Sequence, residues 1–219
     1  LTQFLPMPYG AAMSPTEPAA RPARTKGQAR LEEVLDAAED VLKRRGVEGL
    51  SVRAVAQQVG ISVGNLQYYL PTRAALLDAV FARASQAFRA AVTNEVETAA
   101  SPREAVERLV GVWQREQHQP EQVLFWHLWA VSAHDDAARA TMDRVYGETL
   151  DFLATLLRRV QPGLTAAQAS MRAAAITSLI EGSGLFVGSG RTPPRRLARL
   201  QKEVRALVME MVDRPAPAR

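Results

Sequence analysis

Polar residues between positions 62 and 68 have types suited to hydrogen bonding in a groove of nucleic acid. Asn65 and Gln67 carry side-chain amides, which can bond bidentately to the edge of an adenine. The hydroxyl groups of Ser62 and Tyr68 suit phosphate oxygens, and Gly64 allows close approach to the backbone. Taken one at a time, such an Asn or Gln is more often a solvated residue on a helix surface. The function of the set therefore depends on the elements that position it.

Two short helices joined by a tight turn are predicted over residues 51 to 70. Ser51 is suited to cap the first helix and Gly60 to end it. Ser62 is suited to cap the second helix, which Pro71 closes. The apolar residues expected to fasten the two helices together are Val55, Ala56, Ile61 and Leu66. These are the proportions of a helix-turn-helix, whose second helix can enter the major groove of DNA.

The rest of the chain is predicted to be helical as well. Alanine, leucine, arginine and glutamate are plentiful, and the period-two alternation typical of strands is missing. The further helices are expected at about residues 27–45, 73–96, 103–117, 121–134, 136–160, 165–187 and 195–212. The fold class is therefore all-α. The expected divisions are a disordered tail at 1–25, a three-helix DNA-binding domain at 26–72, a helical bundle at 73–212 and a tail at 213–219.

The stretch from Arg30 to Leu77 resembles the DNA-binding domain of the TetR family of bacterial transcriptional regulators. It carries the family's pattern without a gap, written here as LDAAEDVLKRRGVEGLSVRAVAQQVGISVGNLQYYLPTRAALL. Gln67 stands where Tyr is frequent, Leu70 where Phe usually packs, and Arg73 where Lys is usual. The resemblance implies a homodimer whose two recognition helices read a palindromic operator. It also implies that a ligand bound in the carboxyl-terminal domain changes the separation of those helices.

The resemblance carries roles over to individual positions. Ser51, Tyr69 and Arg73 are expected on phosphates, whereas residues of the second short helix are expected on or near bases. The full set of residues expected to contact DNA is Ser51, Arg53, Ser62, Val63, Gly64, Asn65, Gln67, Tyr68, Tyr69 and Arg73.

Aromatic residues in the second half of the chain suggest a ligand-binding site. Rings at helical spacing can belong to the core or to a pocket, and the family resemblance makes the two readings about equal. Glu181 is the only charged residue between Arg172 and Arg191. It either pairs across a dimer seam or with an internal arginine, which we favour, or faces a pocket and selects a cationic or hydrogen-bonding ligand. The candidate ligand-binding residues are Trp113, Phe125, Trp126, Trp129, Tyr146 and Glu181.

Several other chemistries are not expected. The chain has no cysteine, so it has no thiol nucleophile and no zinc-thiolate site. Its three histidines are not spaced like a known metal motif, and the glycines at 182–190 do not match a dinucleotide loop. We therefore expect no metal site, no cofactor and no catalytic constellation.

Dimerisation is expected through the helices at 165–187 and 195–212, which carry more apolar surface than one small bundle needs. The basic excess lies near the two ends, with nine Lys and Arg against six Asp and Glu in residues 21–73. No segment is apolar enough to cross a membrane, so a cytoplasmic location is expected.

The leading hypothesis is a ligand-responsive dimeric repressor, bound to double-stranded operator DNA and released by a small-molecule effector. An activator or architectural DNA-binding module without an effector is the alternative. An enzyme is the least favoured reading, because the sequence shows no triad, metal motif or phosphate loop.

Overall fold

The computed structural model describes residues 26–119, 122–187 and 194–216, and within them the chain is all-α, as predicted. The expected tail at 1–25 and the last residues, 217–219, lie outside this described part. Nine helices occur in the described residues: α1 (Lys26–Gly49), α2 (Val52–Val59), α3 (Val63–Tyr69), α4 (Arg73–Glu97), α5 (Pro102–Glu116), α6 (Gln122–Ser132), α7 (Asp136–Val160), α8 (Ala166–Val187) and α9 (Pro194–Asp213).

The short helices α2 and α3 begin and end at the residues that the sequence indicated. Ser51 Oγ accepts a hydrogen bond from the backbone N–H of Ala54 at 3.1 Å, and Ser62 Oγ accepts one from that of Asn65 at 3.2 Å. Gly60 ends α2 with φ 74°, in the left-handed region where a side chain is strained. Gly46, expected to end α1, has φ 67° and interrupts its helical geometry, although α1 extends to Gly49.

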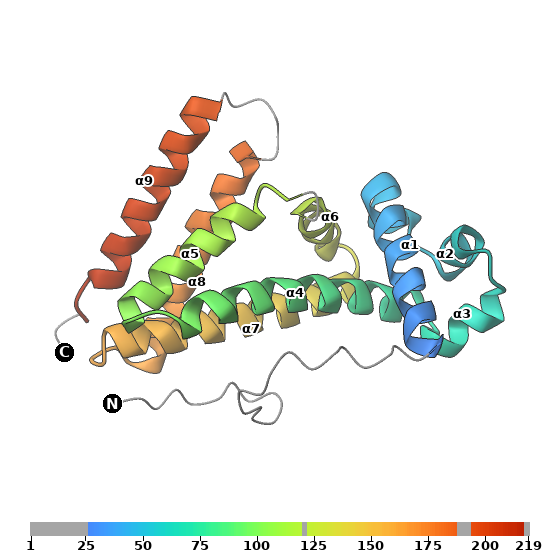
Figure 1. Cartoon of the computed structure of the whole chain (residues 1–219), viewed down its shortest axis with the longest axis horizontal. Coiled ribbons are helices and arrows are strands. Elements are labelled where there is room, and N and C mark those ends of the chain that lie inside the picture. The colour runs from blue at the N-terminus through green and yellow to red at the C-terminus, as the bar shows by residue number, and fades with distance from the viewer. Residues whose placement is uncertain (1–25, 120–121, 188–193, 217–219) are drawn as a thin grey trace.

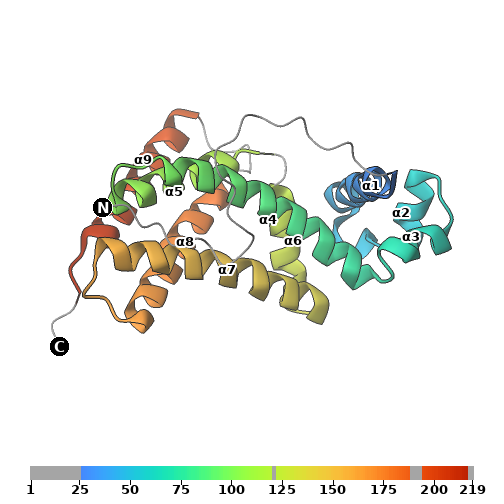
Figure 2. The ribbon, with the colours of Figure 1, turned by 60° about the horizontal axis from the view of Figure 1, so that its bottom comes forward.

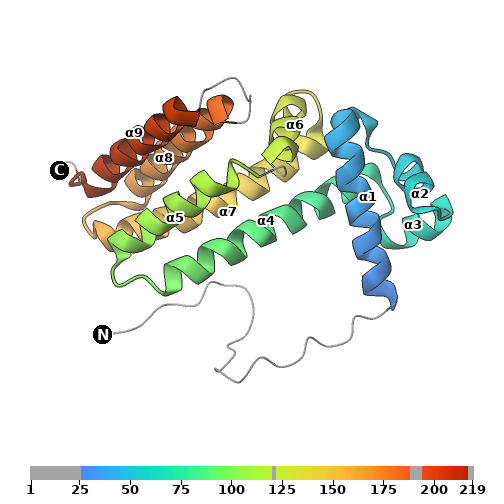
Figure 3. The ribbon, with the colours of Figure 1, turned by 45° about the horizontal axis from the view of Figure 1, so that its top comes forward.

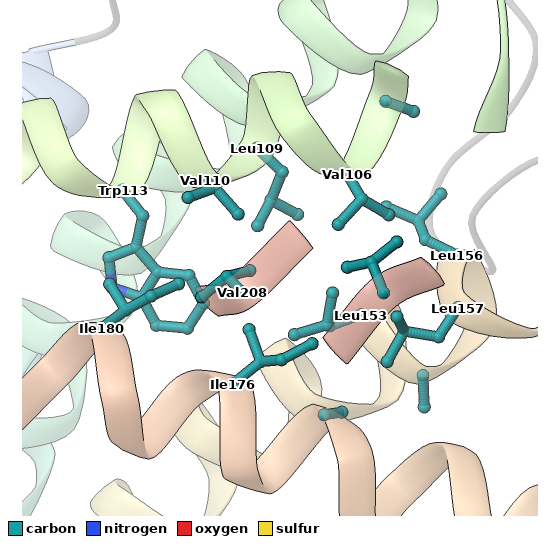
Figure 4. Close-up of a cluster of buried hydrophobic side chains, with 14 of the residues drawn as sticks. Val106, Leu109, Val110, Trp113, Leu153, Leu156, Leu157, Ile176, Ile180 and Val208 are labelled. Atoms are coloured by element: carbon teal, nitrogen blue, oxygen red, sulfur yellow. The ribbon is translucent and has the colours of Figure 1, made fainter. Parts of the chain in front are cut away.

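Two hydrophobic clusters form the interior. One cluster joins α1, α2, α3 and the first half of α4 to residues of α6 and α7, among them Leu124, Leu128 and Val145. The other joins the second halves of α4 and α7 to α5, α8 and α9, and Figure 4 shows its centre around Trp113, Ile176 and Leu153. The first cluster therefore crosses the boundary expected at residue 72.

Helices α4 and α7 run through both clusters. Each has 25 residues, a length of about 37 Å at 1.5 Å per residue. They lie side by side along the long axis of the molecule, with α1, α2 and α3 at one end and α8 and α9 at the other (Figures 1 and 2). Figure 3 shows α6 lying between α1 and the rest of the bundle. Helices α4 and α7 therefore connect the two hydrophobic clusters.

Candidate functional site

Helix α3 presents nearly all of its side chains to solvent. Its one buried residue is Leu66, which packs into the amino-terminal cluster and holds the helix in place. Tyr68 is 83% exposed and its ring lies edge-on to that of Tyr69. The other exposed residues of this face are Ser62, Val63, Gly64, Asn65 and Gln67. A short helix with one anchor and an open polar face can enter a groove without losing its own packing.

Helices α2 and α3 carry no acidic side chain. Between Glu48 and Asp78 the sequence contains no Asp or Glu, whereas Arg53 on α2 is exposed. A Cβ added at Gly64 would meet no atom of this chain within 4 Å, so the space beside its backbone is open to a partner. Both features suit a polyanion that approaches closely.

A hollow of about 470 Å³ lies where the amino-terminal end of α1 meets α3. Two cationic residues of α1, Lys26 and Arg30, line it together with Ser62, Asn65 and Tyr69. Three residues of the predicted DNA-contacting set thus share one concave surface with two cations that sequence reasoning missed. The basic balance of residues 21–73 was the available signal, but it did not single out these two side chains.

Arg73, expected on a phosphate, is engaged within the protein. Its Nε donates to the carbonyl oxygen of Leu50 at 3.2 Å, and its Nη2 donates to that of Val47 at 3.0 Å. Its Nη1 donates to Oδ2 of Asp135 at 2.6 Å. Because a guanidinium has five N–H donors, two remain for a phosphate.

A second cluster of polar and aromatic side chains lies in the bundle. Trp113 Nε1 of α5 donates to Oε1 of Glu181 in α8 at 3.0 Å. Tyr146 of α7 and Gln122 of α6 also hydrogen-bond to this carboxylate. Trp129 Nε1 of α6 donates to Tyr146 Oη at 2.8 Å. We call Trp113, Gln122, Trp129, Tyr146 and Glu181 the Glu181 cluster; four helices contribute to it.

Burial governs the protonation of the Glu181 cluster. Burial raises the pKa of Glu181, against the hydrogen bonds from Trp113, Tyr146 and Gln122 that lower it. Burial, with the nearby carboxylate of Glu181, also raises the pKa of Tyr146, so the phenol keeps its proton and donates a hydrogen bond to the carboxylate.

The structure brings four of the six candidate ligand-binding residues together in this cluster and places Phe125 elsewhere. The Phe125 ring lies 5.5 Å from that of Phe81, edge to face, and packs against the amino-terminal hydrophobic cluster. Trp126 is partly buried on α6. Gln122 was missed by sequence reasoning, since a glutamine at a helix start carries no signal of a contact with a glutamate 59 positions later.

Other sites are not evident in the described part of the chain. Among those residues, no group of three or more His, Cys, Asp or Glu side chains could hold a metal ion. No described helix has the length and hydropathy needed to cross a membrane. The exposed α3 face and the Glu181 cluster are therefore the two candidate sites.

The geometry of α2 and α3 defines a helix-turn-helix DNA-binding protein, and comparisons with known proteins agree. Residues 34–80 match the family described as bacterial regulatory proteins, tetR family. No curated protein is significantly similar to the chain in sequence.

Solved structures share the fold over most of the chain. A proposed transcriptional regulator from Pseudomonas aeruginosa PAO1 has a TM-score of 0.70 at 20% identity, covering 87% of this chain and 95% of its own. A proposed TetR-family regulator from a Rhodococcus species has a TM-score of 0.64 at 22% identity, and the match covers 84% of this chain and 96% of its own. A proposed regulator from Saccharomonospora viridis, solved in complex with choline, has a TM-score of 0.67 at 20% identity. The match covers 84% of this chain and 96% of its own. Residues 34–80 therefore match the amino-terminal domain of the tetR family, and the solved structures show that the chain shares the fold of such regulators.

Proposed function

We propose that the protein is a dimeric transcriptional repressor that binds a palindromic operator and leaves it when a small-molecule effector binds. The observation that carries this proposal is the open face of α3, which Leu66 anchors and which itself carries no acidic residue. In this role the chain is a cytoplasmic regulator and not an enzyme. Asn65 and Gln67 read base edges, while Ser51, Arg53, Tyr69 and Arg73 bind phosphates on either side.

An exposed, uncharged side of α8 supports dimerisation. Met171 is 72% exposed, Leu185 67% and Phe186 54%, and Leu207 of α9 is 46% exposed. Ala167, Ala175 and Ser178 continue the exposed side of α8 between the larger residues. Pairing α8 and α9 with the same helices of a second copy about a two-fold axis covers this surface. It also presents two α3 helices to the two halves of a palindrome.

Coupling between effector and operator is supported by the two long helices. Tyr146 of the Glu181 cluster lies on α7, which also packs in the amino-terminal hydrophobic cluster through Ala138 and Val145. The choline complex of the S. viridis relative shows that this fold can hold a small molecule. A tenfold loss of operator affinity requires only about 1.4 kcal/mol of coupling free energy.

The proposal is tested by footprinting the full chain on the DNA upstream of its own gene, alone and with a panel of metabolites. We expect protection of an inverted repeat that one compound abolishes. Protection that no compound changes would favour a module without an effector. A lack of sequence-specific protection would overturn the proposal.

Base reading is tested by Asn65→Ala. The variant should lose more affinity for the protected repeat, by about 1 to 3 kcal/mol, than for random duplex. The matched control is Gln57→Ala, an exposed amide on α2 outside the proposed base-reading set. Equal loss on both duplexes would remove Asn65 from the base-reading set.

A further inference from the structure

Glu181 is a carboxylate that only neutral groups satisfy within the described part of the chain. Its hydrogen-bond partners there are the Trp113 indole N–H, the Tyr146 hydroxyl and the side chain of Gln122. Among the described residues, no lysine or arginine contributes to the pKa shift of Glu181. A buried carboxylate is costly unless a positive charge or strong hydrogen bonds offset its lost hydration. The described part of the chain thus places a carboxylate here without a matching cation.

Aromatic rings surround this charge. The rings of Trp129 and Tyr146 lie 5.8 Å apart in a tilted pair, and the ring of Phe88 stands edge-on to Trp113 at 5.7 Å. Trp129 is 43% exposed, so the cluster reaches the protein surface at this residue. The faces of Trp and Tyr rings attract cations because of their quadrupole, and most strongly in a site with little water.

A buried hydroxyl group that has no partner among the described residues lies one helical turn before Glu181 on α8. Thr177 precedes Glu181 by four residues on α8, so the two side chains lie on one face of the helix. Thr177 is 7% exposed, and its Oγ1 has no hydrogen-bond partner among the described residues. A buried hydroxyl left unsatisfied is unusual in a native protein and is explained when a bound molecule completes its hydrogen bonding.

We propose that the Glu181 cluster binds a small organic cation, an amine or quaternary ammonium compound, with Glu181 as its counterion and Trp113, Trp129 and Tyr146 as its aromatic walls. Thr177 accepts or donates a hydrogen bond to a polar group of the same molecule. The inference rests on the proposed function, because it names the chemical class of the effector.

An organic cation fits this cluster better than a metal ion. Calcium and magnesium need six or more oxygen ligands, whereas Glu181 is a single carboxylate among ring carbons and N–H donors. A quaternary ammonium ion has no N–H group to hydrate and keeps its charge beside aromatic faces. Of the donors that satisfy Glu181, Trp113 is fixed in the core, whereas the half-buried side chains of Gln122 and Tyr146 can turn away when a cation arrives.

The test is calorimetric titration of the full chain with choline and with 3,3-dimethylbutan-1-ol, the uncharged isostere in which carbon replaces nitrogen. Tetraethylammonium and benzyltrimethylammonium extend the cation series. We expect at least one cation to bind, and choline to bind at least about tenfold more tightly than its isostere. Equal affinity for the isostere, or no binding of any cation at millimolar concentration, would overturn the inference.

Two variants test whether Glu181 is the counterion of the bound cation. Glu181→Gln should weaken cation binding at least about tenfold, whereas Glu97→Gln, at an exposed glutamate on α4, should leave it unchanged. Unaltered cation affinity in Glu181→Gln would place the cation elsewhere and overturn the assignment. Thermal unfolding shows whether Glu181→Gln is folded. If it is not, the titration of the native chain with choline and with its isostere tests the inference instead.

The inference and the proposed function fail in different ways. Cation binding without protection of an inverted repeat would sink the proposed function and leave the site. Protection that a neutral compound relieves, with no cation bound, would sink the inference and leave the function.

Discussion

Arg73 and Asp135, 62 residues apart, form an ion pair with 2.6 Å between Nη1 and Oδ2. The same guanidinium donates to carbonyl oxygens of Val47 and Leu50, just before the helix-turn-helix. Asp135 in turn caps α7, because its Oδ1 accepts the N–H of Ala138 at 2.9 Å. One side chain therefore joins the approach to α2, the start of α4 and the start of α7.

We predict that Asp135→Ala lowers the free energy of unfolding by about 1 to 2 kcal/mol, since it loses both the cap and the ion pair. Asp135→Asn should lose less, because Asn caps helices as well as Asp does. Urea denaturation of both variants measures this, with Asp136→Asn, at a 99% exposed neighbour, as the control. Equal losses in Asp135→Asn and Asp135→Ala would show that the charge, not the cap, carries the effect.

The ion pair also predicts a dependence on pH. The N–H of Ala138, and then Arg73, lower the pKa of Asp135. The folded state therefore binds this proton less readily than the unfolded state. The stabilisation is present above the ordinary aspartate pKa, about 3.9, and is lost as the pH falls through the lowered value. The difference between native chain and Asp135→Asn should shrink at acid pH; a constant difference would contradict this.

Gly64 offers a test that separates folding from DNA binding. Because a Cβ there meets no atom of the chain within 4 Å, Gly64→Ala should keep or raise the stability of α3, by up to about 1 kcal/mol. The added methyl group should nevertheless weaken operator binding, because it stands on the surface proposed to face the groove. Gly147→Ala, on α7 and equally free of contacts, is the matched control and should leave operator affinity unchanged. Unchanged operator affinity in both variants would place the DNA away from Gly64.

Local signals predicted the helices, whereas the long-range contacts needed the structure. Caps such as Ser51 and Ser62 act over three residues, so their pattern is visible in the sequence. Arg73 shows the limit: its type suggested a phosphate, and its pairing with Asp135 depends on how α4 and α7 pack. Glu181 is a second example. The sequence shows that it stands alone among uncharged residues, but not which neutral side chains hydrogen-bond to it.

Lys26 and Arg30 are predicted to bind phosphates in the hollow they share with Asn65. Replacing either with Gln should weaken binding to operator and random duplex alike, and should reduce the slope of log affinity against log salt by about one. Fluorescence anisotropy over a range of salt concentrations measures both, with Lys202→Gln on exposed α9 as the control. A change confined to the operator would mean that these side chains read bases.

A charge in the proposed dimer seam should separate the subunits. Leu185→Asp buries a carboxylate against the partner's apolar surface, so we expect a shift towards monomer in sedimentation at micromolar protein and a loss of operator affinity. Ala87→Asp, at an exposed position on α4, is expected to remain dimeric. A native chain that sediments as a stable monomer would contradict the dimer itself.

Glu181 should make stability depend on pH in the opposite direction to Asp135. Burial raises its pKa, so between the ordinary glutamate pKa and the raised value the folded state holds a proton that the unfolded state has lost. Stability therefore falls as the pH rises through this window, and it stays lower above it.

Glu181→Gln has no such titration. The difference in unfolding free energy between this variant and the native chain should shift in favour of the variant as the pH rises through the window. Any cost of placing an amide in the cluster is the same at every pH, so it does not affect how this difference changes with pH. Glu97→Gln supplies the control. Urea denaturation across the pH range measures it, and parallel curves for Glu181→Gln and the native chain would contradict the raised pKa. A bound organic cation should flatten the native curve, because its positive charge stabilises the ionised carboxylate and lowers the pKa of Glu181.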